Sequence, residues 1–390
     1  MKKEFIKGIA AGITISLAVA AGGYAGYQIR DRGVLSDSEH VQKIRALEAL
    51  IQRDYLGEID ENQLAEGLYA GLIGGLGDPY SRYYTAEEYK QENSATMGAY
   101  VGIGVTMQKN LEGGVEIVEC YEGGPASNAG VKTGDIISAI DDTDITDMEV
   151  SEVADMIRDG KKKQAVLTIH RQNEETPLKL TVEITDVTLP SVFEEMLKEQ
   201  VGYIRISEFT DVTPDQFREA FSSLKKQGME KLIVDLRGNP GGLLTSVCSI
   251  LNEILPEGLI VYTEDKYGER QEQKSEGKTP LDMPFAVLVN ENSASASEIF
   301  AGAVQDHGIG TIVGTTTYGK GVVQELLPLK DGSAVKLTIS DYYTPKGNSI
   351  NHTGIKPDVE VKLDPELLNQ EEITHEEDNQ LQEALKVLEK

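Results

Sequence analysis

From Val201 onward, strand-like and helix-like patterns alternate along the chain, and this alternation limits the fold more than any other feature. Short apolar runs typical of buried strands are separated by amphipathic stretches of helical period. We expect helices at 214–226 and 243–255 and strands at 201–206, 231–236, 285–289, 311–313, 322–329 and 334–343. This order predicts an α/β layer whose strands deliver their loops to one edge, where ligands commonly bind.

Two residues in the expected loops of this layer, Ser295 and Lys320, are candidates for nucleophilic chemistry. Ser295 lies between the apolar run 285–289 and the helix-like stretch 298–304, so its hydroxyl is expected beside the unpaired N–H groups of a helix N-terminus. A lysine can be the base of such a serine if burial lowers its pKa from about 10.4 to roughly 7–8. The spacing alone also fits a helix-capping serine and a solvated lysine in a turn.

Gln324 follows the candidate base by four positions. If 320–326 is extended, Lys320, Val322 and Gln324 share one face. The amide oxygen of Gln324 can then orient the lysine amine, whereas an aspartate in its place would keep the amine charged.

Hydrolysis of a peptide also needs backbone donors for the oxyanion. The N–H group of Ala296, directly after the candidate nucleophile, is the natural first donor. Gly241 or Gly242, in the turn after the strand 231–236, is the expected second donor. The residues leave open which of the two glycines donates.

A separate small module is expected over residues 96–186. One helix fits at 149–157, and strands fit at 100–108, 115–120, 136–140, 165–170 and 178–184. The module resembles a PDZ domain in its glycine-rich turns, which are Gly102-Ile103-Gly104-Val105, Gly124-Pro125-Ala126, Ala129-Gly130 and Gly134-Asp135-Ile136-Ile137. In such a domain, the loop formed by Gly102, Ile103, Gly104 and Val105 presents N–H groups to a C-terminal carboxylate, and the peptide adds as a strand.

Composition excludes several classes of function. The chain has 37 Lys and Arg against 65 Asp and Glu, a formal charge of −28, which argues against binding nucleic acid or an anionic membrane surface. Its two cysteines, Cys120 and Cys248, lie in apolar segments of different expected domains, so a disulfide framework is not expected. The five histidines show no metal-binding spacing, and we expect neither a metal nor a cofactor.

The first 29 residues have the pattern of an export signal. Three lysines precede an uncharged run from Gly8 to Tyr27, which is just long enough to span a bilayer. Ala18-Val19-Ala20 also fits a cleavage site, so a signal anchor and a cleaved signal both remain open. Either one places the rest of the chain on the extracytoplasmic side, because the lysines stay inside.

Helical regions are expected at both ends of the exported part. In the region 37–95, the stretches 40–53 and 61–73 have helical periodicity, which fits either a dimerisation region or part of an enzyme's shell. The acidic region 364–390 ends in a helix-like stretch, 379–388, which either packs on another chain or is solvated.

From about residue 40 to its end, the chain resembles the C-terminal processing peptidases, the tail-specific proteases of the S41 serine family. The motifs agree in order and are Leu76-Gly77-Asp78-Pro79-Tyr80-Ser81, the PDZ glycines, Arg237-Gly238-Asn239-Pro240-Gly241-Gly242, Ser295-Ala296-Ser297-Glu298, Gly319-Lys320-Gly321 with Gln324, Thr344-Pro345 with Gly347 and Ser349-Ile350, and Gly354-Ile355 with Pro357-Asp358. Glu298 and Asp306 match family positions that we interpret as supporting structure.

The resemblance implies an α/β (α+β multidomain) chain with a ββα-type protease core at 187–363, an inserted PDZ domain at 96–186, and helical N- and C-terminal regions. It implies Ser295 as nucleophile, Lys320 as base and Gln324 as its orienting residue. It also implies protein substrates with apolar C-terminal tails, a membrane anchor, a plausible homodimer, and a PDZ domain that holds the site inactive until a tail binds. Arg171, at the end of a PDZ strand, is a candidate for carrying that signal.

Two other interpretations compete with a Ser–Lys protease. His307, next to Asp306, lies near Ser295 in sequence and could serve as the base, although a solvated or capping histidine explains it better. Alternatively, the chain is an inactive scaffold that only binds peptide tails. The chemically matched set of Ser295, Lys320 and Gln324 argues against a scaffold.

Overall fold

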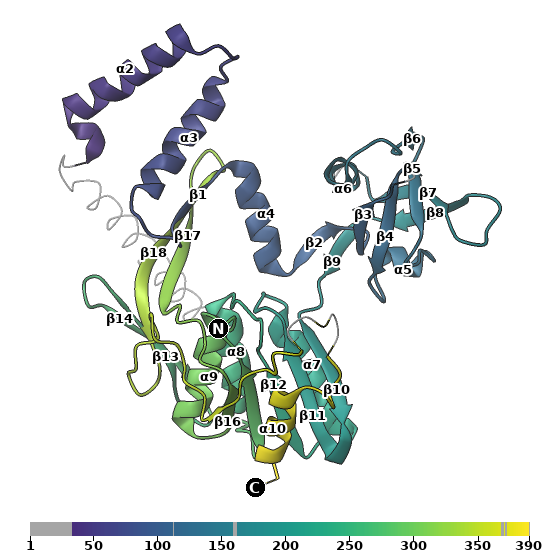
Figure 1. Cartoon of the computed structure of the whole chain (residues 1–390), viewed down its shortest axis with the longest axis vertical. Helices are drawn as coiled ribbons and strands as arrows, with labels where there is room; N and C mark the ends of the chain where they lie inside the picture. Colours follow the sequence, from purple (N-terminus) through teal and green to yellow (C-terminus); the bar gives the residue numbers. More distant parts are fainter. Residues whose placement is uncertain (1–32, 112, 159–161, 368–369, 371–372, 390) are drawn as a thin grey trace, which may run out of the picture. The chain divides into compact units, whose positions relative to one another are not determined.

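The computed structural model (Figure 1) describes residues 33–111, 113–158, 162–367, 370 and 373–389. The chain divides into two compact units, and the boundary between them in the sequence falls between Tyr69 and Ala70. The expected export signal, residues 1–29, lies outside the described residues. Within the described ranges, no helix combines the length and apolar character needed to cross a membrane.

The first unit is helical. A single 3-10 turn, η1 (Val34–Ser36), precedes α2 (Ser38–Asp54), whose first turn is capped by the carboxylate of Asp37. α3 (Glu61–Gly74) begins in this unit and ends past its boundary. None of the residues of α2 or α3 is buried in the single chain, and several of their apolar side chains are exposed, including Leu47, Leu50, Leu68 and Leu72.

The α/β region expected from Val201 onward is built around a six-stranded sheet. Its strands, in spatial order, are β10 (Val192–Leu197), β11 (Val201–Ile206), β12 (Lys231–Asp235), β15 (Phe285–Val289), β16 (Thr311–Gly314) and β19 (Val359–Glu360). All neighbouring pairs are parallel except β10 with β11. Because β12 and β15 are adjacent and parallel, the loops that follow Asp235 and Val289 leave the same edge of the sheet side by side.

Helices cover both faces of this sheet. α7 (Thr213–Lys226), α8 (Leu244–Ile254) and α9 (Ala296–His307) share one apolar core with alternate strand residues such as Leu232 and Val234. Ile233, which points to the other face, packs with the C-terminal helix α10 (Asn379–Val387). α10 is therefore part of the core rather than a solvated end, as expected for a parallel sheet buried on both sides.

The structure also contains a second sheet, which has five strands. It contains β1 (Arg82–Tyr84), β13 (Gly258–Asp265), β14 (Arg270–Ser275), β17 (Val322–Pro328) and β18 (Ala334–Tyr343). β18 pairs with β1, β13 and β17. β10, β13 and β14 were not predicted from the sequence, and β14 gives little signal because it is polar and almost wholly exposed.

The module expected at 96–186 contains a five-strand meander and one long helix. Its strands are β3 (Val105–Lys109), β4 (Val115–Cys120), β5 (Ile136–Ile140), β7 (Gln164–His170) and β8 (Leu178–Glu183), with the short β6 (Thr143–Asp144) beside β5. The helices are α5 (Pro125–Asn128) and α6 (Val150–Arg158). β3 is an edge strand, so its outer side is open to a further strand.

Two short strands, β2 (Ala99–Gly102) and β9 (Thr185–Thr188), pair at the ends of this module. The sequence predicts one strand over 100–108. The structure divides it into β2 and β3 at Gly104, whose φ of 80° suits glycine and interrupts the extended backbone. α4 (Ala86–Met97) leads from β1 into β2.

Candidate active site

Ser295 lies at the junction between the β15 loop and α9, where sequence analysis placed it. α9 begins at Ala296, so the Ser295 side chain lies at a helix N-terminus. Its backbone has φ 54° and ψ −111°. Such a conformation is rare for a residue other than glycine and costs about 1–3 kcal/mol, so the surrounding contacts must hold it in place.

The carboxylate of Glu298 supplies those contacts. Its Oε2 accepts hydrogen bonds from the backbone N–H groups of Ser295 (2.8 Å) and Lys320 (2.9 Å). Its Oε1 accepts from the hydroxyl of Thr317 (2.6 Å) and the N–H of Gly319 (2.7 Å). Burial raises the pKa of Glu298, and these hydrogen bonds act in the opposite direction. One buried side chain thus joins the segment of the candidate nucleophile to that of the candidate base.

Lys320 is half-buried in a pocket that disfavours its charged form. Burial lowers the pKa of Lys320, and the positive charge of Lys336 lowers it further. The carboxylates of Asp78 and Glu298 work in the opposite direction without reversing the shift. A lowered pKa is the property that a lysine base requires near neutral pH.

Two tyrosines that sequence analysis did not assign to the site lie against Lys320. Lys320 Nζ lies 4.7 Å from the centre of the Tyr80 ring, over its face. The hydroxyl of Tyr342, a buried residue of β18, donates to the Lys320 carbonyl. Tyr80 belongs to the motif Gly77-Asp78-Pro79-Tyr80-Ser81, so its signal was present in the sequence. The contact of Tyr342 depends on the pairing of β17 with β18 and has no local signal.

A cleft of about 440 Å³ contains the candidate catalytic residues. Ser295, Lys320 and Gln324 all contribute to its wall. Its apolar lining comes from Phe209, Pro240, Leu243, Leu244, Ile299, Val322, Val323 and Leu326. Three charged residues, Glu92, Glu208 and Lys336, also line it, and Lys336 Nζ pairs with Glu92 Oε1 at 2.6 Å. The cleft thus combines the reactive groups with an apolar surface.

Lys320, Val322 and Gln324 all line this cleft, although only Val322 and Gln324 belong to β17. β17 begins only at Val322, and the register shift beside Gln324 comes from one extra residue, Ile339, in the partner strand β18. The Gln324 Nε2 group donates to the Val322 carbonyl and to Thr338 Oγ1, each at 3.3 Å. In the described part of the chain, no hydrogen bond joins the Lys320 amine to Ser295 Oγ or to Gln324.

The structure distinguishes the two glycines of the expected oxyanion site. The N–H of Gly241 donates to Asn239 Oδ1 at 2.8 Å, so it is already used. Gly242 lines the cleft, and its N–H makes no hydrogen bond within the described residues. A Cβ on Gly241 would lie 2.8 Å from Ser295 Cβ and 3.0 Å from the nitrogen of Ala296, which shows how closely this turn approaches the candidate nucleophile.

His307 lies at the opposite end of α9 from Ser295. The helix has 12 residues, so its two ends are separated by about 18 Å. The His307 ring packs against Gly258, and its Nε2 lies 2.7 Å from the Leu259 carbonyl. Closeness in sequence therefore does not bring this histidine into the cleft.

The small module has a groove between its edge strand β3 and α6. The groove, of about 250 Å³, is lined by the expected loop residues Gly102, Ile103 and Val105 and, from α6, by Ala154, Ile157 and Arg158. Gly104 lies in the same loop, with a φ of 80°. Arg171, considered above as a signalling residue, instead pairs with Asp135 inside the module through two hydrogen bonds of 2.7 and 2.8 Å.

Sequence comparisons agree with this architecture. Residues 200–361 match the profile described as Peptidase family S41, and residues 116–171 match that of the PDZ domain. Residues 17–88 match the profile described as Activating protease CtpB N-terminal domain. The fold and these matches together define a chain with an S41 peptidase module and a PDZ module.

Individual relatives point to the same family. A "Probable CtpA-like serine protease" of Staphylococcus aureus (strain COL) is 34% identical over 329 residues, which cover 84% of this chain and 66% of the relative. One of Staphylococcus epidermidis (strain ATCC 35984) is 34% identical over 328 residues, covering 83% of this chain and 65% of the relative. The chain thus spans just under two thirds of the length of these relatives. It belongs to peptidase family S41 and is similar to the CtpA-like C-terminal processing proteases.

The matches among solved structures include two proteases. The photosystem II D1 C-terminal processing protease is 27% identical, with a TM-score of 0.48, and the match covers 85% of this chain and 89% of that one. A putative S41 protease from Bacteroides fragilis is 19% identical, with a TM-score of 0.49 and coverage of 88% and 97%.

Proposed function

We propose that this chain is a serine endopeptidase in which Ser295 is the nucleophile, Lys320 the base and Gln324 the residue that orients the base. One observation carries the proposal. A single cleft holds the Ser295 hydroxyl, a lysine whose pKa is lowered by burial, and the N–H groups of Ala296 and Gly242, which make no hydrogen bond within the described residues. These are the nucleophile, base and oxyanion donors that peptide hydrolysis needs.

In the first half of the reaction, the neutral Lys320 amine takes the hydroxyl proton of Ser295 while Oγ attacks the carbonyl carbon of the scissile bond. The carbonyl oxygen becomes an oxyanion, which accepts hydrogen bonds from the N–H groups of Ala296 and Gly242. When the carbonyl re-forms, the C–N bond breaks and the leaving amine takes the proton from Lys320. An ester between Ser295 and the acyl part of the substrate remains.

The second half repeats these steps with water. Lys320 removes a proton from the attacking water, and the second tetrahedral oxyanion uses the same two N–H donors. Collapse of this intermediate releases the carboxylate product and returns the proton from Lys320 to Ser295 Oγ. The lysine therefore alternates between base and acid, which suits a group whose pKa is closer to neutrality than that of an ordinary lysine.

Gln324 needs a rearrangement to take its role. Its Nε2 group faces the Val322 carbonyl and Thr338, and the Lys320 amine is not hydrogen-bonded to Ser295. Catalytic hydrogen bonds often form only when substrate is bound. We assign the missing contacts to the peptide-bound state, in which the bulge of β18 opposite Gln324 gives the paired strands room to adjust.

The PDZ groove supplies a candidate trigger for that rearrangement. A peptide can add as a strand along the edge of β3, with its terminal carboxylate at the N–H groups of the Gly102–Val105 loop. Arg158 lines the groove and offers a positive charge to the carboxylate. The apolar lining from Ile103, Ala154 and Ile157 favours an apolar last residue. Substrates are accordingly proteins with apolar C-terminal tails, and tail binding activates the protease.

The N-terminal uncharged run and the exposed side chains of α2 and α3 support a proposal for where the protein acts and how it assembles. The uncharged run 8–27, preceded by lysines, anchors the protein or directs its export, so the substrates are exported proteins. The exposed apolar side chains of α2 and α3 fit a homodimer contact.

Cleavage of an unstructured protein with an apolar tail tests the catalytic assignment. The purified full chain in mild detergent is compared with Ser295→Ala, Lys320→Ala and Gln324→Ala at neutral pH, with circular dichroism to confirm folding. We expect no cleavage by the first two variants and a strongly reduced rate for the third. Cleavage by Ser295→Ala at the wild-type rate would refute the assignment. Tail binding by a folded wild-type chain that does not cleave would favour a scaffold instead.

Variants in the PDZ groove test whether a bound C-terminal tail activates the protease. Ala154→Glu places a carboxylate where the peptide must bind, and Ser151→Glu places the same group on the exposed side of α6. A tail peptide added in trans should accelerate cleavage of a tail-less substrate by the wild type and by Ser151→Glu, but not by Ala154→Glu. Equal acceleration of all three would contradict activation through this groove.

A further inference from the structure

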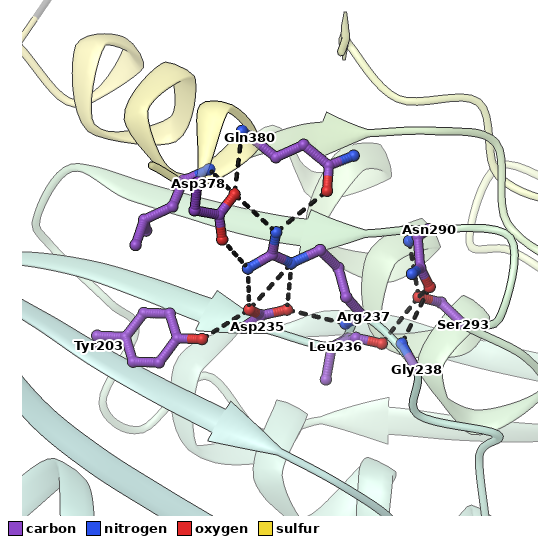
Figure 2. Close-up of polar contacts among 10 residues, drawn as sticks. Tyr203, Asp235, Leu236, Arg237, Gly238, Asn290, Ser293, Asp378 and Gln380 are labelled. Carbon is purple, nitrogen blue, oxygen red and sulfur yellow. Dashed lines mark hydrogen bonds and ion pairs between the residues drawn. The ribbon is translucent and has the colours of Figure 1, made fainter. Parts of the chain in front are cut away.

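The guanidinium of Arg237 is held between two carboxylates from opposite parts of the core (Figure 2). On one side, Nε and Nη2 donate to Asp235, at the end of β12, over 2.6–3.0 Å. On the other side, Nη1 and Nη2 donate to Asp378 at 3.0 and 2.8 Å. Nη1 also donates to Gln380 Oε1 at 3.1 Å, so that Nε and both terminal nitrogens are fully engaged.

This arrangement is buried, and its residues come from the end of β12 and from the start of α10. The side chains of Arg237, Asp235 and Asp378 are only 16%, 4% and 9% exposed. Asp378 is also the N-cap of α10, because its Oδ1 accepts from the N–H groups of Gln380 and Leu381. One carboxylate therefore fixes the start of the last helix and the arginine together.

Arg237 lies on the loop that carries the proposed oxyanion donor, five residues before Gly242. The next residue, Gly238, donates its N–H to Asn290 Oδ1 at 3.0 Å, which ties this loop to the one that carries Ser295. The carbonyl of Asn239 accepts from the N–H of Ala294 at 3.0 Å. The loop is thus secured to the nucleophile on one side and, through Arg237, to α10 on the other.

We propose that Arg237 and Asp378 are positioning residues, which orient the Gly242 N–H toward the oxyanion by holding its loop against the N-terminus of α10. The proposal rests on the proposed protease activity. It assigns a role in the reaction to a helix that covers the face of the sheet away from α8 and α9. A displacement of about 1 Å in a catalytic group can cost roughly 100-fold in rate. A charge-assisted bidentate pair gives the required geometric precision.

Asp378→Asn is the informative variant. Asparagine remains a good helix N-cap, so α10 keeps its start, but a neutral amide cannot accept both Arg237 hydrogen bonds. With a fluorescence-quenched peptide as substrate and the full chain as enzyme, we expect kcat to fall roughly 10- to 100-fold with little change in KM. Arg237→Lys should act in the same way, because a lysine cannot bridge two carboxylates in this geometry.

A pair of inhibitors distinguishes a misplaced oxyanion donor from a general loss of structure in the cleft. With a peptide aldehyde, Ser295 Oγ adds to the aldehyde carbon, the serine proton passes to Lys320, and the former carbonyl oxygen occupies the oxyanion site. The corresponding peptide alcohol fills the same cleft without forming an oxyanion. In Asp378→Asn, the aldehyde should bind more weakly by about the factor lost in kcat, while binding of the alcohol should be unchanged.

Two matched controls lie on the same helix. Leu381→Ala removes a buried apolar contact of α10 but leaves the Arg237 contacts intact, and Glu383→Gln removes a half-buried charge that pairs with Lys386. Both should retain the wild-type kcat and aldehyde affinity, although Leu381→Ala should lower Tm. Wild-type kcat in Asp378→Asn, or an equal loss of kcat in Leu381→Ala, would overturn the positioning role. A wild type that neither cleaves nor binds the aldehyde would overturn the protease assignment itself, together with the role that rests on it.

Discussion

Ser295 and Lys320 donate their backbone N–H groups to the same oxygen atom, Oε2 of Glu298, at 2.8 and 2.9 Å. The spacing between the candidate nucleophile and its base therefore depends on a third side chain, which is buried within the first turn of α9. Because the backbone of Ser295 has a conformation unusual for serine, this carboxylate also holds strained geometry in place.

Glu298→Gln should damage both stability and activity. Whichever way its amide is turned, the NH2 group faces N–H or O–H donors, and each buried donor left unpaired costs about 1–3 kcal/mol. We expect lower stability in urea unfolding and a fall in kcat of roughly 100-fold, since Ser295 and Lys320 lose their common anchor.

Glu291→Gln is the matched control for this change. Glu291 is exposed and accepts a hydrogen bond from Thr315 Oγ1 at 2.9 Å, so its loss should change stability by less than about 0.5 kcal/mol. If Glu298→Gln kept the wild-type kcat, the common anchor would have no part in catalysis.

The pH dependence of the rate should reflect Lys320 and its neighbour Lys336. The base must be neutral, so kcat/KM should rise with pH, with a midpoint below the ordinary lysine pKa because burial lowers that of Lys320. Lys336→Met removes the positive charge that lowers it further, and it also releases the carboxylate of Glu92. Both effects favour the protonated amine, so the midpoint should shift to higher pH.

Lys330→Met serves as the comparison in this titration. Lys330 is exposed in the turn between β17 and β18, where solvent screens its charge. Its loss should leave the midpoint in place. A midpoint that did not move in Lys336→Met, or that moved to lower pH, would show that Lys336 does not influence the group that controls the rate.

The parts of the site that were predicted from sequence are those with a local signal. Ser295 was expected at a helix N-terminus because an apolar strand precedes it and a helical pattern follows, and Gly241 and Gly242 were expected in a turn for the same reason. The family motifs led to the S41 assignment and to the fold class, which the comparisons confirm.

The rest depends on contacts between segments that are distant in the sequence. Asp378 lies 141 residues from Arg237, and nothing in the acidic C-terminal region indicates that it would meet the oxyanion loop. The register shift beside Gln324 is likewise a property of the paired strands β17 and β18, and periodicity in one strand does not show it. Glu298 was assigned a supporting role from sequence, but its four donors come from two segments that only the fold brings together.

Lys320→Met should abolish cleavage and stabilise the fold at neutral pH. Because the pKa of Lys320 is lowered in the folded state, the folded chain binds this proton less well than the unfolded chain does. Stability of the wild type therefore rises with pH between the folded and the unfolded pKa of the lysine, and it is lowest below that window. Methionine keeps most of the side-chain volume without a charge to bury.

Urea unfolding of the wild type and Lys320→Met from pH 7 to pH 10 measures this effect. The variant should be the more stable protein at pH 7, and the difference should narrow as pH rises. Lys330→Met should stay within about 0.5 kcal/mol of the wild type throughout. A stability difference between the variant and the wild type that stayed constant or grew with pH would mean that the pKa of Lys320 is not lowered in the folded state.

His307→Ala should leave the cleavage rate unchanged. His307 belongs to the last turn of α9, at the far end from Ser295, and its Nε2 lies 2.7 Å from the carbonyl of Leu259. Loss of this contact should cost about 1 kcal/mol in urea unfolding, as is typical for one hydrogen bond, while kcat and KM remain those of the wild type. If kcat instead fell as far as in Lys320→Ala, the base would have to be reassigned, and α9 would have to rearrange to bring the imidazole to Ser295.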